Sequence, residues 1–297
     1  MLDSALASLL HCEVTIHASH PLGGGCISDV TSVELSLRRQ NAPAERTAMV
    51  VKRQPAAKVP MFEAEADGLR ALGAVESIRC PEVHAVGVVE DFSNLVKARI
   101  TPERPGKDAF SQLGRRLAEL HQATSGSVIG WHADNFLGSA IQPNASRGCW
   151  VDFLRKQRIG FQLKWAVTQH LVDRRLASDL ERILDRMDEL LEGRQDNTSL
   201  LHGDLWSGNY LLTHHGVVLI DPAVYRGCRE AEWGMISWFG NCPSAFERGY
   251  LDAWPLPSGW QRRVAIYRLY HQLNHLNLFG GSYVETCRSA AASICGF

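Results

Sequence analysis

The sequence has no long apolar run. No stretch approaches the about 18 apolar residues of a membrane-spanning helix, and residues 1–12 lack the basic start and the long apolar core of a secretory signal peptide. We therefore expect a protein with no membrane partner and with a cytoplasmic location.

An excess of charge of either sign is also missing. The 297 residues carry a formal net charge of −1, and the sequence pI is about 6.9. Such a balance provides no basic field for nucleic acid or for an anionic membrane, so selectivity must come from local sites. We expect no nucleic-acid partner, and we expect a monomer or a weak homodimer.

The eight cysteines form no Cys-x-x-Cys pair and no zinc-type spacing with histidine, which argues against a disulfide scaffold and a zinc module. We expect most of them to be reduced thiols of the core. A chain that is 45% hydrophobic and 21% charged can bury a sizeable core, and its length suggests one large domain or two lobes.

Oxygen-bearing side chains instead gather around the glycines that follow residue 200. Asp204 and Asn209 lie on a loop in which Gly203 and Gly208 permit tight turns. Two short apolar strands follow, joined by a turn at residues 213–216, and the second strand delivers Asp221 at its end. We expect the side chains of Asp204, Asn209 and Asp221 to converge.

Phosphoryl transfer from ATP requires such a set of side chains. One carboxylate receives the proton of the attacking hydroxyl, while an amide and a second carboxylate hold Mg²⁺ on the phosphates. We assign Asp204 as the catalytic base, and Asn209 and Asp221 as the metal ligands. The alternative is that these residues only cap backbone amides in a glycine-rich turn. Their spacing and the flanking strands favour the catalytic interpretation, because they match the catalytic and metal loops of the protein-kinase-like fold.

The N-terminal part of the chain predicts a nucleotide site. Two strands are joined by Gly23, Gly24 and Gly25, whose backbone amides can approach phosphates closely, although a plain hairpin turn explains the glycines equally well. The next strand ends at Lys52, where this fold places the lysine that neutralises phosphate charge. Glu65 lies beside the buried stripe of the helix that follows, so we expect it to pair with Lys52.

Strands over residues 83–89 and 95–100 complete the small lobe. The fold class predicted is α+β, a bilobal protein-kinase-like fold: an N-terminal nucleotide-binding lobe, residues 1–100, with a five-stranded antiparallel sheet and one main helix, and a larger, mainly helical lobe, residues 101–297, with the catalytic loop and the acceptor site. Backbone groups of Ala98, Arg99 and Ile100 form the hinge and are expected to bind adenine.

Residues 126–150 are rich in Gly, Asn and Ser, and we expect them to be a loop between helices. Trp131, Asp134 and Asn135 in this loop are candidates to line the acceptor end of the site, with ordinary turn chemistry equally possible. Apolar periodicity predicts further helices over residues 110–120, 176–191, 260–279 and 283–294.

Residues 201–209, with the sequence LHGDLWSGN, resemble the signature of the fructosamine kinase (ketosamine-3-kinase) family, which is similar to aminoglycoside and choline kinases. Residues 23–28, 61–66, 130–135 and 229–232 agree with the same family. The resemblance implies ATP and Mg²⁺ as cofactors. It also implies phosphorylation of the O3 hydroxyl of a ketosamine, such as a fructosamine or ribulosamine adduct, either small or protein-linked. Because such phosphorylated ketosamines tend to decompose, the resemblance implies a deglycating role.

The sequence departs from the family at two places. The hinge lacks the usual acidic residue near Ala98 and the usual aromatic residue near Arg99. Glu232 stands where the family usually has aspartate, at a side chain that is expected to brace the catalytic loop. The resemblance further implies that Cys26 can act as a redox switch, although a small side chain tolerated in a tight loop explains this cysteine as well.

Two alternative functions differ in class. An aminoglycoside or choline-type phosphotransferase is the first, but its cationic acceptor usually calls for an acidic cleft, whereas the Trp, Asn and Asp side chains of residues 130–138 suit a sugar. A nucleotide-binding pseudokinase is the second. It predicts the loss of Lys52, Asp204, Asn209 or Asp221, and all four are present.

Overall fold

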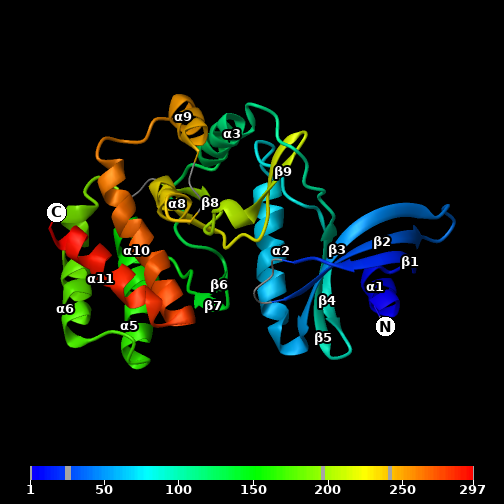
Figure 1. Ribbon diagram of the computed structural model, residues 1–297, viewed down its shortest axis with the longest axis horizontal. Coiled ribbons are helices and arrows are strands. Elements are labelled where there is room, and N and C mark those ends of the chain that lie inside the picture. The colour runs from blue at the N-terminus through cyan, green and yellow to red at the C-terminus, as the bar shows by residue number, and fades with distance from the viewer. Residues whose placement is uncertain (1, 24–27, 195–197, 240–242, 297) are drawn as a thin grey trace.

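The computed structural model of the chain describes residues 2–23, 28–194, 198–239 and 243–296. An antiparallel sheet forms one part of the molecule, and the other part is mainly helical (Figure 1). The sheet has the order β1-β2-β3-β5-β4. The elements of this part are α1 (Leu2–Leu10), β1 (Glu13–Pro21), β2 (Asp29–Arg38), β3 (Glu45–Pro55), η1 (Ala56–Lys58), α2 (Val59–Gly73), β4 (Val83–Val89) and β5 (Phe92–Ala98).

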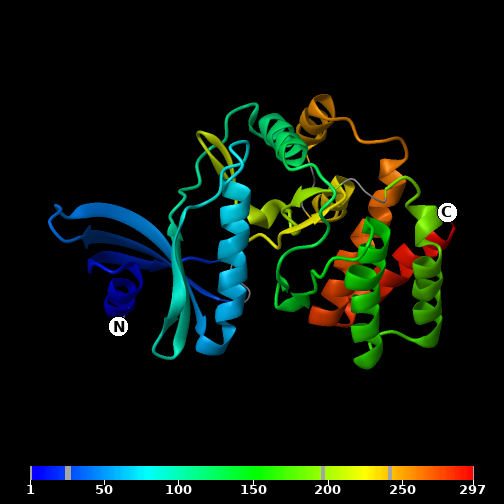
Figure 2. The same cartoon turned by 180° about the vertical axis from the view of Figure 1, so that it is seen from behind.

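The two faces of this sheet are covered by different helices, because successive side chains of a strand point to opposite faces. Alternate residues of β2 and β3, such as Leu35 and Val51, pack with Leu6 of α1. The opposite face packs with α2, whose buried residues Phe62 and Ala66 contact Leu95 of β5. Figures 1 and 2 show α2 between the sheet and the helical part.

The helical part follows residue 100. Its helices are α3 (Ala109–Ala123), α4 (Trp150–Phe153), a π-helical turn η2 (Leu154–Ile159), α5 (Gly160–Thr168), α6 (Arg174–Asp185), α7 (Met187–Leu190), η3 (Ser207–Asn209), η4 (Arg229–Ala231), α8 (Glu232–Ile236), α9 (Ser244–Ala253), α10 (Trp260–Phe279) and α11 (Ser282–Cys295). Its short strands are β6 (Asn135–Leu137), β7 (Ala140–Gln142), β8 (Ser199–Leu201), β9 (Tyr210–Thr213), β10 (Gly216–Leu219) and β11 (Tyr225–Gly227).

The predicted α+β fold class, with a five-stranded antiparallel sheet and a mainly helical second part, is confirmed. The division at residue 100 into two domains stays a prediction. The prediction of a plain loop over residues 126–150 is wrong, because β6 and β7 form a hairpin there. The helix predicted over residues 176–191 is interrupted, since α6 ends at Asp185 and α7 begins at Met187. The strand predicted over residues 95–100 is β5, which begins at Phe92 and ends at Ala98.

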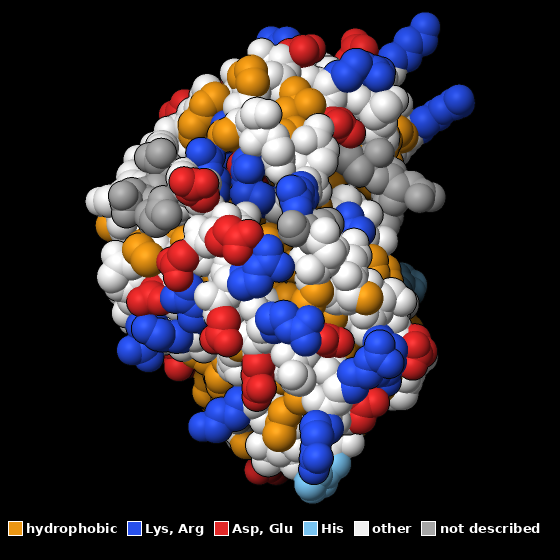
Figure 3. Space-filling view, turned by 90° about the vertical axis from the view of Figure 1, so that its left-hand side faces the viewer, with side chains coloured by type: hydrophobic (Ala, Val, Ile, Leu, Met, Phe, Trp, Pro, Cys, Tyr) orange, Lys and Arg blue, Asp and Glu red, His pale blue; other side chains and the backbone are white. Residues whose placement is uncertain are grey.

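Charged side chains of both signs are interspersed on the face of the helical part that lies farthest from the sheet (Figure 3). Ion pairs of the helical part include Arg155 with Asp152, and Arg288 with Asp173. Exposed pairs of this kind contribute little stability. Among the helices that the structure describes, none combines the length and the apolar character needed to cross a membrane.

Candidate active site

Glu232 of α8 contacts the loop of residues 202–209, which is called the catalytic loop below because it carries the predicted base. This side chain is buried, and its two carboxylate oxygens accept the backbone N–H groups of His202 (2.7 Å) and Gly203 (3.1 Å). His121 on α3 lies 3.6 Å from the same carboxylate. These interactions keep the pKa of Glu232 below its usual value despite burial. The prediction that Glu232 braces the catalytic loop is confirmed by these contacts.

His202 links the catalytic loop to the end of β10. Its Nε2 lies 2.9 Å from the carbonyl oxygen of Ile220, and its Nδ1 accepts the N–H of Asp204 (3.3 Å). This pattern assigns the neutral tautomer with the proton on Nε2, because a carbonyl accepts and an amide donates. Burial lowers the pKa of His202, which agrees with the neutral form.

Asn209 holds Asp204 in a fixed orientation. The Nδ2 group of Asn209 donates to the backbone oxygen of Asp204 (2.8 Å) and to its carboxylate Oδ2 (2.9 Å). Both amide hydrogens are thereby used, which leaves the Oδ1 of Asn209 as the atom able to ligate a cation. Burial raises the pKa of Asp204 well above its usual value, and the nearby carboxylates of Asp221 and Glu232 add to the shift.

The segment of residues 220–224, which follows β10, packs against the catalytic loop. Gly203 has a φ of +81°, and a Cβ on it would lie 2.0 Å from the carbonyl oxygen of Ala223, so glycine is required there. The N–H of Ala223 donates to the carbonyl of His202 (2.8 Å). Asp221 has a φ of 54°, a backbone conformation that is uncommon outside glycine and that clusters at functional sites.

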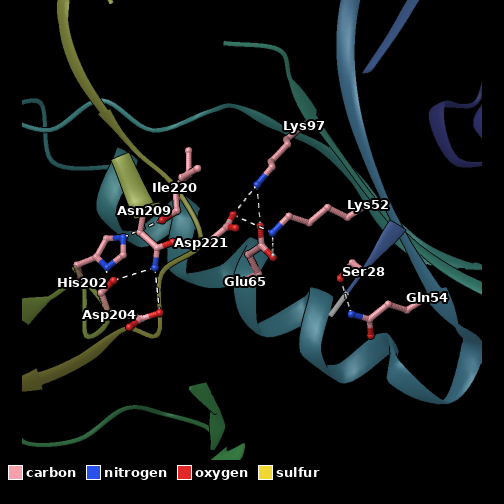
Figure 4. Close-up of polar contacts among 10 residues, drawn as sticks. All are labelled: Ser28, Lys52, Gln54, Glu65, Lys97, His202, Asp204, Asn209, Ile220 and Asp221. Carbon is pink, nitrogen blue, oxygen red and sulfur yellow. Dashed lines mark hydrogen bonds and ion pairs between the residues drawn. The ribbon is translucent and has the colours of Figure 1, made fainter. Parts of the chain in front are cut away.

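Two lysines and two carboxylates meet between the sheet and the helical part (Figure 4). Lys52 of β3 lies 2.8 Å from Glu65 of α2 and 2.8 Å from Asp221. The predicted pairing of Lys52 with Glu65 is therefore confirmed. Lys97 of β5 lies 2.8 Å from the other oxygen of Glu65 and 3.0 Å from Asp221. The pKa of Asp221 is held well below its usual value by Lys97 and Lys52, against the effect of burial.

Lys97 belongs to this cluster, although the sequence did not predict it. A lysine side chain is almost never fully buried unless it is paired, and Lys97 is only 4% exposed. The signal in the sequence was its place within the apolar run that ends at Ala98, two residues after Leu95 and therefore on the same face of the strand.

Helix α2 packs closely on the segment that carries Asp221. A Cβ added to Gly68 would lie 3.0 Å from Pro222 and 3.2 Å from Val224. Glu65 lies one turn before Gly68, and it shares the ammonium groups of Lys52 and Lys97 with Asp221.

Only part of the glycine loop is described. Gly23 ends the described stretch after β1, whereas Gly24, Gly25 and Cys26 lie outside the described residues. Ser28, just after the loop, accepts a hydrogen bond from Gln54 of β3, which fixes the start of β2 on the sheet. The predictions for the phosphate-binding glycines and for Cys26 stay predictions.

The hinge has one backbone donor that remains available. The N–H of Ala98 donates to Glu82 (2.8 Å), and the N–H of Arg99 donates to Ala48 (3.1 Å). Among the backbone contacts of the described residues, no acceptor is found for the N–H of Ile100. Of the three amides, that of Ile100 is therefore the one able to donate to a purine nitrogen.

The three residues predicted to line the acceptor site make hydrogen bonds with different parts of the protein. The indole N–H of Trp131 donates to Asp67 of α2 (2.7 Å), so this side chain joins the helical part to the small lobe. Asp134 is exposed and accepts the N–H of Asn144 (2.7 Å). Asn135 is buried and donates to the carbonyl of Val224 (2.7 Å). Asn135 thus ties the β6–β7 hairpin to the segment after Asp221.

The fold and this site together define a protein-kinase-like phosphotransferase architecture. An aminoglycoside phosphotransferase, APH(4)-Ia, solved in a ternary complex with AMP-PNP and hygromycin B, has the same fold, with a TM-score of 0.67 at 16% identity over 100% of this chain and 99% of that chain.

The chain belongs to the fructosamine kinase family, whose family model matches residues 2–295. It is 40% identical to a probable ketoamine kinase of Synechocystis over 79% of each chain. It is 37% identical to the chloroplastic protein-ribulosamine 3-kinase of Oryza sativa subsp. japonica, over 92% of this chain and 76% of that one. A solved structure assigned as a fructosamine-3-kinase from Thermobifida fusca has a TM-score of 0.87 at 29% identity, covering 100% of this chain and 99% of that chain.

Proposed function

We propose that this protein transfers the γ-phosphoryl group of ATP to the O3 hydroxyl of a ketosamine, either a small adduct or one attached to a protein. Membership of the fructosamine kinase family and the names of the two curated relatives support the substrate class. The observation that carries the chemistry is the orientation of Asp204, whose carboxylate is fixed by Asn209 and whose other oxygen, Oδ1, is buried without a partner among the described residues.

Asp204 is the proposed general base. A carboxylate accepts the proton of a hydroxyl more readily when its pKa is raised towards the working pH, and burial shifts Asp204 in that direction. The unpaired Oδ1 offers the incoming hydroxyl an acceptor. Because phosphoryl transfer requires little covalent chemistry from the protein, the remaining side chains act mainly by positioning and charge neutralisation.

Asn209 and Asp221 are the proposed ligands of Mg²⁺. The free Oδ1 of Asn209 and the carboxylate of Asp221 are hard oxygen donors, which suit this ion, and Mg²⁺ usually binds one or two protein ligands together with substrate phosphates and water. No group of three or more His, Cys, Asp or Glu able to hold a metal occurs within the described ranges. When bound, the ion would neutralise charge on the phosphates.

The nucleotide is proposed to lie between the sheet and the helical part. Lys52 and Lys97 provide positive charge for its phosphates, and the N–H of Ile100 is proposed to donate to adenine. The glycines at positions 23, 24 and 25 are proposed to cover the phosphates.

For the acceptor we retain Asp134, Asn135 and Trp131 as proposed determinants with unequal roles. Asp134 is exposed and can offer a carboxylate oxygen to a sugar hydroxyl. Trp131 can present a ring face while its N–H stays on Asp67. Asn135 is proposed to act by holding the hairpin that carries the other two residues, because its amide is already engaged.

The direct test is phosphate transfer from ATP measured across fructosyl-lysine, ribosyl-lysine, an aminoglycoside and choline. Turnover on the two ketosamines and none on the others is expected. A preference for the aminoglycoside or choline would contradict the ketosamine assignment, and no turnover on any acceptor would favour a nucleotide-binding module.

Asp204→Asn tests the base. We expect turnover to fall by at least about 10²-fold, the lower end for the loss of a general base, while ATP affinity is retained. Near-normal turnover of the folded variant would exclude Asp204 as the base.

A further inference from the structure

The nucleotide site holds a second lysine, Lys97, in addition to the lysine expected at position 52. We propose that Lys97 is a second phosphate-binding cation, which allows the protein to bind the triphosphate without a divalent ion and disfavours binding of a divalent ion without the nucleotide. This inference rests on the proposed ATP site.

The register of the sheet places both ammonium groups on the same side. Lys52 of β3 lies opposite Leu95 of β5, and Lys97 lies opposite Val50. Because residues two apart on a strand point to the same face, Lys52 and Lys97 are diagonal neighbours on the face that packs with α2. Figure 4 shows their ammonium groups converging on Glu65 and Asp221.

Stability alone does not explain a buried lysine at this position. Taking an ammonium group out of water costs several kcal/mol in order of magnitude, and apolar residues of similar volume often replace buried ion pairs without loss of stability. Lys97 has a side chain that is only 6% exposed, and its ammonium group points towards Glu65 and Asp221. A functional use of the charge therefore accounts for its presence better than packing does.

Both lysines keep a donor for a phosphate. An ammonium group has three N–H donors. Lys97 donates to Glu65 and Asp221, whereas Lys52 donates to Glu65 and forms an ion pair with Asp221, so each lysine uses at most two donors within the described residues. One N–H on each remains for phosphate oxygens, which carry the negative charge that two ammonium groups attract.

The same arrangement makes Asp221 a weaker ligand for a metal ion in the absence of nucleotide. One oxygen of Asp221, Oδ1, already lies 2.8 Å from Lys52 and 3.0 Å from Lys97. A divalent cation at this carboxylate would lie close to two ammonium groups, and like charges repel strongly where water is excluded. Phosphates that draw the ammonium groups towards themselves would relieve this repulsion.

The experiment compares ATP binding by calorimetry with EDTA and with Mg²⁺, and binding of Mn²⁺ alone by electron paramagnetic resonance. Lys97→Met is expected to weaken metal-free ATP binding by at least about 10-fold, which corresponds to about 1.4 kcal/mol. It is expected to weaken Mg·ATP binding by less than about 3-fold and to tighten Mn²⁺ binding to the nucleotide-free protein, since one repelling charge is gone. Lys97→Arg, which keeps the charge, should restore metal-free ATP binding.

Lys164→Met on α5 is the matched control, because Lys164 is exposed and lies in the helical part. It should leave all three affinities unchanged. Lys97→Gln, which keeps an N–H donor for Glu65 but not the charge, provides the same comparison if Lys97→Met does not fold. Unchanged metal-free ATP binding in a folded neutral variant, or an equal loss with and without Mg²⁺, overturns the inference. Failure of the parent protein to bind ATP under any condition overturns the proposed function itself.

Discussion

The brace formed by Glu232 can be tested against a matched carboxylate two residues away. Glu230 and Glu232 are both buried, and each accepts two hydrogen bonds. Glu232 accepts two backbone amides of the catalytic loop, whereas Glu230 binds Arg263 at 2.7 and 2.8 Å. The variants Glu232→Gln and Glu230→Gln therefore each remove the charge and one acceptor oxygen of a buried carboxylate, at different places.

The expected loss of stability in Glu232→Gln follows from its contacts. A glutamine keeps one acceptor oxygen, so one of the two backbone amides of the loop would face an NH₂ group. Losing a hydrogen bond to a charged group costs about 1.5–3 kcal/mol, and leaving a buried donor unpaired costs a further amount of about 1 kcal/mol or more. We expect a loss of at least about 2.5–4 kcal/mol in the free energy of unfolding, measured by urea denaturation.

Turnover distinguishes the two positions. Since a displacement of about 1 Å at a catalytic group can lower the rate about 10²-fold, Glu232→Gln should lower kcat by about 10- to 100-fold while ATP affinity stays nearly constant. Glu230→Gln should lose comparable stability and keep kcat within about 3-fold, because Arg263 does not contact the loop. Equal kcat values for the two folded variants would refute the idea that Glu232 positions the catalytic loop.

Three further predictions use other parts of the site and the core. Gly203→Ala should abolish turnover and destabilise the fold by more than about 1 kcal/mol, measured by thermal denaturation, because of its positive φ and the contact with Ala223; a stable, active variant would contradict this. Burial lowers the pKa of His271 to about 3, below the unfolded value of 6.5, so this group's contribution to stability is fully present above pH 6.5 and is lost as the pH falls towards 3. His271→Gln should therefore flatten the pH dependence of the free energy of unfolding by about 2 kcal/mol between pH 6.5 and 5, and an unchanged slope would exclude this origin. Asp134→Ala should lower kcat/KM for a ketosamine by an amount equivalent to about 1–3 kcal/mol of transition-state stabilisation, without changing ATP affinity. Trp131→Phe, which also loses the hydrogen bond to Asp67, should lower kcat/KM by a smaller factor. Unchanged sugar kinetics in Asp134→Ala would show that the hairpin has only a structural role.

The grouping of the proposed catalytic and metal residues could be predicted because their geometry is local. Asp204 and Asn209 share one loop, and a two-stranded hairpin carries the chain to Asp221. Lys52 and Glu65 are farther apart in the sequence, but the apolar stripe of α2 fixed which acidic side chain turns towards the sheet.

The sequence marks Lys97 only as a lysine within an apolar run, because its partners lie 32 and 124 residues away. Its pairing with Glu65 and Asp221 depends on the sheet register, which brings it beside Lys52. The β6–β7 hairpin escaped prediction for a similar reason. Its strands have three residues each, too few to show alternation, and its stability depends on buried amides such as those of Asn135 and Gln142.

The close contact at Gly68 implies that the alignment of the two lobes depends on the small volume of this residue as well as on the ion pairs between them. A single methyl group there would meet Pro222 at 3.0 Å and would press α2 away from the segment that follows Asp221. A shift of a few tenths of an ångström would lengthen the contacts that join Glu65 to Asp221 through Lys52 and Lys97, without removing any ionisable group. The absence of a side chain at one position on a helix thus sets the spacing of charges contributed by two different parts of the chain.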